Sequence, residues 1–237
     1  MASKFETSFG ARLRKFEDAI QYIQNWPVYT PSRPEIAIAE LQALVQSIKN
    51  ANNKETDIQL HYQEAVAVRT ALFSKGAQSL EKLMSSIRFN VNFLYGRQSP
   101  QAESIGSIIR RFRSSRLIKL PADPANPDAE KTISQSQRSY GSRTQFFADI
   151  VTTLKSSPNY SSDNAALTLA ALEQKLADLT TASNNVASQL QKIASIRKER
   201  LIQYEQMAKA ARLIKDYAAA QYGNRSTEYR SVMALGL

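Results

Sequence analysis

The sequence predicts an all-α protein made of two tandem antiparallel helical bundles that arose by internal duplication. Its two halves repeat one another: Ser8-Phe9-Gly10 returns as Ser139-Tyr140-Gly141, at an offset of 131. Further along the offset is 127, where Tyr95-Gly96-x-x-Ser99 matches Tyr222-Gly223-x-x-Ser226. The second copy thus lacks about one helical turn, and the chain of 237 residues has only 7 glycines and 8 prolines. Both features favour helices, and the long period assigns one copy of the fold to each half.

The first predicted helix of each copy carries one apolar stripe. Its members recur every three or four residues, as Phe9, Leu13, Phe16, Ile20 and Ile23 in the first copy and as Tyr140, Phe147, Val151 and Leu154 in the second. The helix ends at Trp26-Pro27, and its counterpart ends at Ser157-Pro158. Proline stops a helix because it has no amide hydrogen and restricts the residue before it.

The second helix is expected to begin after Ser32 in the first copy and after Asp163 in the second. Both residues can accept a hydrogen bond from a free amide at a helix start. Polar clusters follow at 50–54 and 181–185, where side chains compete for backbone hydrogen bonds, and these clusters predict turns. The alternative is one long helix in each copy, because the apolar spacing continues across the second cluster.

The third helix of each copy is expected to end at the Tyr-Gly pair, because Gly96 and Gly223 can adopt the left-handed conformation that satisfies terminal carbonyls. A fourth helix starts at Ser99-Pro100 and at Ser226, and it is shorter in the second copy.

These elements place the first bundle at residues 1–120 and the second at residues 133–237. Residues 121–132 between them are rich in proline and predict a semi-rigid linker.

The aromatic-Gly opening, the Pro-x-Tyr interruption and the closing Tyr-Gly-x-x-Ser resemble a group of uncharacterised bacterial tandem-repeat helical proteins. The resemblance covers both halves and implies the helical fold and its duplication. It implies no activity and no functional residue.

Positive charge is concentrated at the end of the first half. The chain has a formal net charge of +10, and the stretch 108–119 contains only basic charges, on Arg110, Arg111, Arg113, Arg116 and Lys119. On a helix over 105–120 these residues would surround an apolar stripe, which indicates a site for nucleic acid, another polyanion or an anionic membrane. The alternative is that this helix closes the first bundle and keeps its arginines in water.

Residues that enzymes and metal sites need are scarce in this chain. There is no cysteine, and the single histidine, His61, has only Glu64 one turn away, which is less than a carboxylate-bridged metal site requires. No phosphate-binding glycine loop occurs, and Glu17-Asp18 lie on the solvated face of the first helix. We therefore expect no catalytic residue, metal, cofactor or small-molecule substrate.

Tyrosines hold equivalent positions in the two copies, Tyr29 with Tyr160 and Tyr95 with Tyr222. Tyrosine is favoured in interfaces, so these residues would suit a paired binding surface. We expect instead that each ring packs over a helix end while its hydroxyl reaches a carbonyl or water.

The predicted function is therefore non-enzymatic: a structural or protein-interaction module that self-associates or belongs to a larger assembly. Nucleic-acid or polyanion binding through the helix 105–120 is the first alternative, and peripheral association with anionic membranes is the second. The sequence shows neither a secretion signal nor a membrane-spanning apolar run, so we expect a cytoplasmic location.

Overall fold

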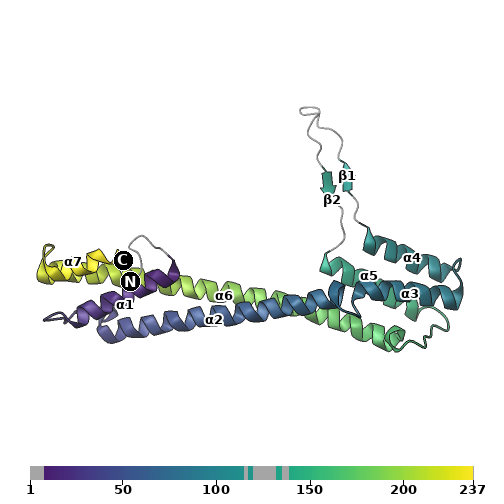
Figure 1. Ribbon diagram of the computed structural model, residues 1–237, viewed down its shortest axis with the longest axis horizontal. Helices are drawn as coiled ribbons and strands as arrows, with labels where there is room; N and C mark the ends of the chain where they lie inside the picture. Colours follow the sequence, from purple (N-terminus) through teal and green to yellow (C-terminus); the bar gives the residue numbers. More distant parts are fainter. Residues whose placement is uncertain (1–7, 115–116, 120–131, 135–138, 237) are drawn as a thin grey trace, which may run out of the picture. The chain divides into compact units, whose positions relative to one another are not determined.

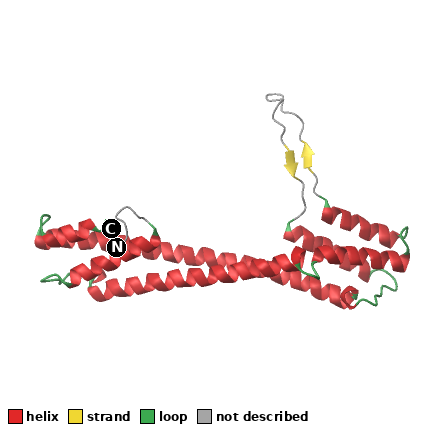
Figure 2. Ribbon diagram, in the orientation of Figure 1, coloured by secondary structure: helices red, strands yellow, loops and turns green. Residues whose placement is uncertain are grey.

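The computed structural model describes residues 8–114, 117–119, 132–134 and 139–236, and nearly all of them are helical (Figure 1, Figure 2). The α-helices are α1 (Phe9–Gln24), α2 (Ile38–Thr70), α3 (Leu80–Tyr95), α4 (Pro100–Arg113), α5 (Tyr140–Lys155), α6 (Leu169–Tyr222) and α7 (Thr227–Ala234). Shorter helical segments are the 3-10 turns η1 (Pro34–Ile36) and η3 (Ala165–Leu167) and the π-helical turn η2 (Ala71–Lys75). The predicted all-α class is confirmed. None of the described helices combines the length and the apolar character needed to cross a membrane.

A short antiparallel pair of strands lies between α4 and α5 in the chain. β1 (Leu117–Lys119) pairs with β2 (Thr132–Ser134), and Ile118 lies opposite Ile133. The predicted linker at 121–132 lies outside the described residues, except for its last residue, which belongs to β2.

The predicted helix over 105–120 is wrong beyond Arg113, where α4 ends. Ser114 follows in an extended conformation with ψ of 133°, while its amide still donates to the carbonyls of Arg110 and Arg111. Serine has low helix propensity, and the segment beyond it enters a strand.

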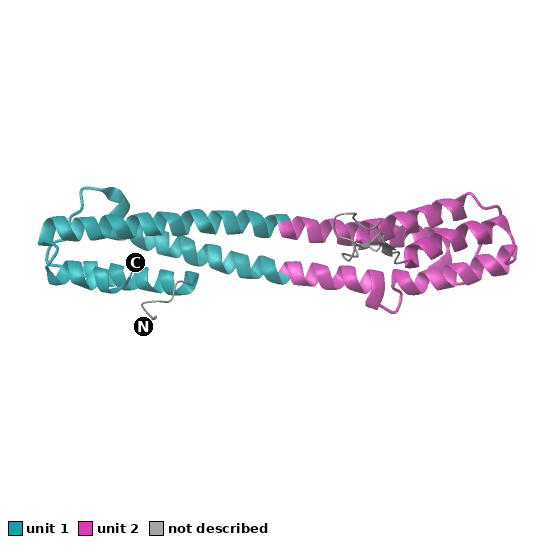
Figure 3. Cartoon of the chain, turned by 90° about the horizontal axis from the view of Figure 1, so that it is seen from above, with its two compact units in different colours: residues 1–60, 191–237 teal, residues 61–190 magenta. Residues whose placement is uncertain are grey.

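The chain forms two compact units, and each unit takes helices from both halves of the sequence (Figure 3). Unit 1 consists of residues Met1–Leu60 and Gln191–Leu237, and unit 2 consists of residues His61–Leu190. The structure therefore does not divide into one bundle at 1–120 and another at 133–237. The reason is the length of α2 and α6, because each of these helices begins in one unit and ends in the other.

Both long helices run without interruption through the polar clusters at 50–54 and 181–185, so the predicted turns are wrong. Polar side chains there bond within the helix: Ser183 Oγ donates to the Leu179 carbonyl at 2.9 Å. The neighbouring Ala182 is buried at the same time. Tertiary packing thus outweighs the weak helix propensity of these residues.

The second helix of each half also begins later than the predicted caps at Ser32 and Asp163. A 3-10 turn comes first, with Arg33 at the N-cap of η1 and Asn164 at the N-cap of η3. Pro34 occupies the first position of η1, where a missing amide hydrogen costs nothing.

Corresponding elements of the two halves lie at constant offsets. α1 and α5 both have 16 residues and bury Phe16 and Phe147 completely. η1 and η3 begin at the offset of 131, as do α2 and α6. Towards the end of each half the offset is 127, and Gly96 and Gly223 end α3 and α6 with φ angles of 85° and 87°. The predicted helix ends at these glycines are confirmed.

The offset between the halves changes from 131 to 127 where the helical path is interrupted in the first half but not in the second. After η2, the segment Gly76–Ser79 leads into α3, whereas α6 continues to its end as one helix. The Gly76 amide donates to the Ala71 carbonyl at 2.9 Å. A Cβ on Gly76 would lie only 2.7 Å from that same oxygen, so the break requires glycine.

Replacing Gly76 with alanine should destabilise the protein by about 1–3 kcal/mol, because the added methyl group would press on a backbone oxygen that the turn holds in place. Gly106→Ala is the matched control, since Gly106 lies inside α4 with open space around it. Alanine at that position should stabilise the protein by about 0.5–1 kcal/mol. Urea unfolding measures both changes, and a stabilising Gly76→Ala would contradict the role assigned to this turn.

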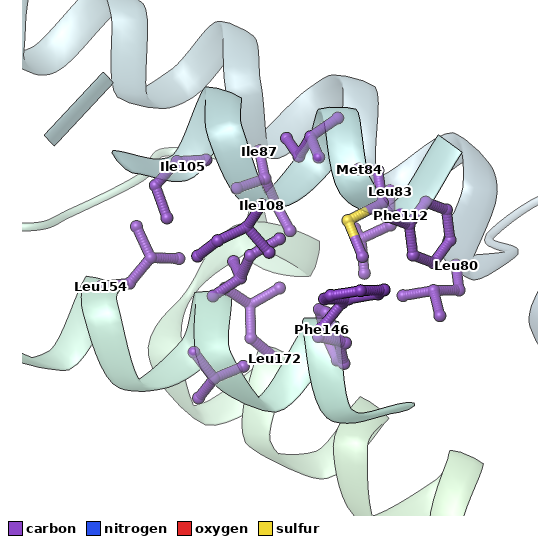
Figure 4. Packing of buried hydrophobic residues seen from close by; sticks show 14 of the residues in the cluster. Leu80, Leu83, Met84, Ile87, Ile105, Ile108, Phe112, Phe146, Leu154 and Leu172 are labelled. Carbon is purple, nitrogen blue, oxygen red and sulfur yellow. The ribbon is translucent and has the colours of Figure 1, made fainter. Parts of the chain in front are cut away.

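Each unit has its own hydrophobic core. In unit 1 the buried residues come from α1, η1, α2, α6 and α7, and Phe16, Tyr204 and Ile214 are among them. In unit 2 they come mainly from α3, α4, α5 and the start of α6, and Figure 4 shows part of this cluster around Ile108 and Phe146. The last helix of one half packs on the first helix of the other, α7 on α1 in unit 1 and α4 on α5 in unit 2.

Candidate binding surface on α3 and α4

The basic run singled out in the sequence is not gathered on one helix. Arg110, Arg111 and Arg113 lie on the last turn of α4 and are exposed. Lys119 belongs to β1, and Arg116 lies outside the described residues. The structure therefore does not place these five basic residues on one helix over 105–120, because α4 ends at Arg113.

The arginines of α4 also have different surroundings. The guanidinium of Arg111 lies 5.5 Å from the centre of the Phe146 ring on α5, so it covers the core of unit 2. Arg113 instead reaches α3, where its Nη2 donates to Ser85 Oγ at 2.7 Å. Arg113 thereby joins a group of residues on α3 and on the turn that follows it.

A pocket of about 370 Å³ lies between α3 and α4 at this point. Its lining is mostly polar and contains no acid, being formed by Ser85, Arg88, Phe89, Asn92, Arg97, Ala102 and Arg113. Arg88 and Arg97 bring two guanidinium groups to this lining, and their charge favours an anion in the pocket.

Two phenylalanine side chains are exposed on the outer side of α3. Leu83, Ile87 and Val91 form the stripe that α3 buries, and Phe89 and Phe93 lie off that stripe with 72% and 84% of their surface exposed. Because they are one turn apart on one helix, the two rings are neighbours. We refer to Arg88, Phe89, Phe93, Arg97 and Arg113 as the arginine–phenylalanine surface.

The turn between α3 and α4 fixes the position of Arg97. Gly96 ends α3 in the left-handed region that glycine adopts readily, and its amide donates to the Asn92 carbonyl at 3.0 Å. Ser99 then caps α4, where its Oγ accepts from the Ala102 amide at 3.1 Å. The predicted helix start at Ser99 is thus confirmed, and Arg97 lies between two anchored residues.

Arg88 and Arg97 form no ion pair with any other residue that the structure describes. Arg143 of α5 is different, because its Nη2 lies 2.7 Å from Glu81 Oε1 and its guanidinium lies 4.8 Å from the centre of the Phe112 ring. The arginine–phenylalanine surface can therefore hold an anionic group, since guanidinium donors bind phosphate or carboxylate oxygens in pairs.

The helical scaffold does not require the two phenylalanines or the arginine of the turn, because unit 1 lacks them, although Lys215 corresponds to Arg88. At the offset of 127, Phe89 and Phe93 correspond to Asp216 and Ala220, and the arginine of the turn corresponds to an asparagine. The turn itself is retained around Gly223. The difference therefore lies in exposed side chains rather than in the fold.

Other arginines build the units through stacking on aromatic rings. In unit 2 the Arg69 guanidinium lies 4.0 Å from the centre of the Tyr140 ring, which contacts Phe73 with its centre 4.8 Å away. The same arginine–aromatic layer recurs in unit 1 at the offset of 131, as Arg200, Phe9 and Tyr204. In both units the layer joins residues from the two halves of the chain.

The layer of unit 1 contains a buried carboxylate that unit 2 lacks. Glu55 Oε1 accepts from Arg197 Nε at 2.9 Å, and its other oxygen pairs with Arg200. In unit 2, Val186 and Val66 occupy the positions equivalent to Glu55 and Arg197.

The paired tyrosines make the helix-end contacts that the sequence predicted. Tyr29 donates from its hydroxyl to the Ile36 carbonyl at 2.6 Å, and Tyr160 donates to the Leu167 carbonyl at 2.8 Å. Burial raises the pKa of both phenols above the usual value. These hydroxyls fasten the 3-10 turns to the preceding loops.

Tyr95 and Tyr222 tie the two halves of the chain together. Tyr95 donates from its hydroxyl to the Pro158 carbonyl at 2.9 Å, and Tyr222 donates to the Val28 carbonyl. Each tyrosine therefore anchors the loop that follows the first helix of the other half.

A larger pocket of about 540 Å³ lies beside the Gly76–Ser79 insertion. Two lysines line it, Lys82 and Lys175, and Lys175 Nζ donates to the Gln78 carbonyl at 2.8 Å. Burial lowers the pKa of Lys175, and Asp178 opposes that shift. Lys175 thus secures the insertion.

His61 is exposed on α2, with its Nδ1 3.3 Å from Glu64 Oε2. Across the described ranges, no group of three or more His, Cys, Asp or Glu side chains is placed to hold a metal ion.

Arg88, Phe89, Phe93 and Arg97 are not among the site residues predicted from the sequence. A signal for the two phenylalanines was present, because they lie off the buried stripe of α3 and have unlike counterparts in the second half of the chain.

The fold and the surface together define a class of protein: an all-helical chain with two units built from both halves, one of which presents exposed basic and aromatic side chains. Comparison with protein-family models, with curated proteins and with solved structures finds no match.

Proposed function

We propose that this protein is a non-enzymatic interaction module within a larger assembly and that it binds its partner through the arginine–phenylalanine surface. One observation carries the proposal: Phe89 and Phe93 are largely exposed beside arginines, at positions where unit 1 carries Asp216 and Ala220. Aromatic residues and arginine are the side chains that most often dominate binding energies at interfaces.

Contacts of the buried polar groups support a scaffold role for the rest of the molecule. The Arg143 guanidinium pairs with Glu81, and the Glu55 carboxylate pairs with two arginines of α6. The tyrosines with raised pKa, Tyr29 and Tyr160, donate to backbone carbonyls. Each of these groups thus has a structural partner that accounts for its place.

An internal duplication is part of the proposal, and exchanged contacts support it. The Thr30 amide donates to the Tyr217 hydroxyl at 3.1 Å, while Asn90 Nδ2 donates to the Ser161 carbonyl at 3.2 Å. Thr30 and Ser161 are equivalent at the offset of 131, and Asn90 and Tyr217 are equivalent at the offset of 127. The second contact therefore joins the counterparts of the two residues that make the first contact. The half that supplies the residue near the first helix in one contact supplies the residue near the Tyr-Gly pair in the other.

The double variant Phe89→Ser/Phe93→Ser should lose the partner that the tagged wild-type chain retains from extracts of its native cells. Both side chains are mostly in solvent, so the change should leave the fold intact. Mass spectrometry and nucleic-acid staining of the retained material provide the measurement.

The matched control is Leu201→Ser/Ile202→Ser, which removes an exposed apolar pair from unit 1. It should retain the same partner as the wild type. Retention of every partner by the phenylalanine variant would show that another surface makes the interaction.

A further inference from the structure

We propose that the arginine–phenylalanine surface binds single-stranded nucleic acid. This inference rests on the proposed function, because it names the partner of the same surface. Single-stranded RNA or DNA presents negatively charged phosphates together with unpaired bases whose flat faces are accessible. The surface offers a matching group to each of these features.

Phosphates match the pocket between α3 and α4. Its lining brings Arg88, Arg97 and Arg113 together without an acid. The volume of about 370 Å³ is in the range of pockets that hold small ligands. A planar guanidinium can donate two hydrogen bonds to one phosphate, which favours this anion in a concave site.

Bases match the two exposed rings. Phe89 and Phe93 are one helical turn apart, with about 5–6 Å expected between their Cβ atoms, so each can stack on one of two successive bases. Asn92 lies on the same side of α3 and lines the pocket, where its amide offers donors and an acceptor to a base edge. Phenylalanine makes no hydrogen bond to a base, so we expect binding that tolerates many sequences.

Three other partners fit less well. A duplex keeps its bases stacked inside, which leaves the two rings without a base face to contact. A membrane-bound helix needs a broad apolar face, whereas the apolar stripe of α3 at Leu83, Ile87 and Val91 is buried in the core. An acidic protein segment would match the arginines, but only its aromatic residues carry flat rings, whereas every nucleotide of a single strand carries both a phosphate and a flat base.

Fluorescence anisotropy with the full chain tests the proposal. The probe is a labelled oligouridine of about 16 nucleotides, the upper end of site sizes for single-strand-binding modules. The same RNA in a duplex and vesicles of phosphatidylcholine with phosphatidylserine serve as competitors. We expect binding of the single strand that weakens steeply between about 50 and 200 mM salt, and competition by the duplex that is at least about tenfold weaker.

Two double variants separate the phosphate and base contributions. Arg88→Gln/Arg97→Gln should weaken binding at least about tenfold and reduce the slope of log affinity against log salt by about 1.4, since each phosphate contact to a single strand contributes about 0.7. Phe89→Leu/Phe93→Leu keeps the apolar character but removes the aromatic faces, and it should also weaken binding at least about tenfold.

The matched control is Arg225→Gln/Arg230→Gln, which removes the same charge from exposed residues of unit 1. It should bind like the wild type, and circular dichroism should show the same helical content for all variants. The proposal is overturned if the leucine variant binds like the wild type, if both glutamine variants behave alike, if the duplex binds as tightly as the single strand, or if only vesicles bind.

Failure of this inference can be distinguished from failure of the interaction function. If Phe89→Ser/Phe93→Ser loses a partner from cell extracts while the wild type does not bind oligouridine, the surface is an interaction site for another molecule. If the serine variant keeps every partner and no oligouridine is bound, both proposals are wrong.

Discussion

Replacing Glu55 with valine should lower the free energy of unfolding by about 3 kcal/mol, even though unit 2 carries valine at the equivalent position. The Glu55 side chain is only 10% exposed, and Arg200, which pairs with it, is 20% exposed. Removal of the carboxylate would leave this arginine with a largely buried charge and no anionic partner. Equilibrium unfolding in urea measures the loss.

The double variant Glu55→Val/Arg197→Val tests the reason for that loss. It reproduces the arginine–aromatic layer of unit 2, where Arg69 stacks on Tyr140 beside two valine positions. We expect the double variant to be about as unstable as Glu55→Val alone, because Arg200 still lacks an anionic partner in it and Arg197 has already lost its own. Arg197→Val alone should cost less than Glu55→Val, because the Arg197 side chain is 54% exposed. Losses that add up in the double variant would contradict this interpretation.

Phe16→Ala and Phe147→Ala should each destabilise the protein by about 3–5 kcal/mol, because each removes a completely buried ring and leaves a cavity. The two losses should appear in different places, since Phe16 belongs to the core of unit 1 and Phe147 to the core of unit 2. Amide hydrogen exchange should therefore accelerate in α1 and α7 for Phe16→Ala, and in α3, α4 and α5 for Phe147→Ala.

Phe93→Ala provides the control for these two variants. Its ring is 84% exposed, so the unfolding free energy should change by less than about 0.5 kcal/mol. If Phe16→Ala and Phe147→Ala accelerated exchange equally in all helices, the assignment of separate cores would be wrong.

Local features of the fold could be predicted from the sequence because they depend on nearby residues. The stripes around Phe16 and Phe147 follow from helical spacing, and the helix ends at Gly96 and Gly223 follow from the positive φ that glycine tolerates. These predictions need no knowledge of which helices pack together.

The division into units could not be predicted in the same way. Similar halves carry similar apolar stripes, so pairing within a half and pairing between halves bury the same kinds of residue. The length of α2 and α6 decides the outcome, and it depends on packing around polar residues such as Asn52, whose Nδ2 donates to the Tyr204 hydroxyl at 3.2 Å. Helix propensity alone favoured turns at these clusters.

The candidate surface was missed for a related reason. A run of charges along the sequence drew attention to Arg110 and its neighbours, whereas the pocket joins Arg113 of α4 to Arg88 of α3 and to Arg97 in the turn. Residues from two helices and a turn come together only when the helix pair is known. The two phenylalanines lie off the buried stripe of α3, and composition alone does not show their exposure.

Under the proposed duplication, the presence of helices from both halves in each unit has a consequence for the origin of this chain. A forerunner chain with a single copy would have had one long helix. At each end of that helix, the helices that the other half now supplies would have been missing. Two identical forerunner chains would have supplied those helices to one another as a two-fold symmetric homodimer. Under the same proposal, gene fusion would then have tethered the two subunits, and only one half would have acquired exposed phenylalanines beside its arginines.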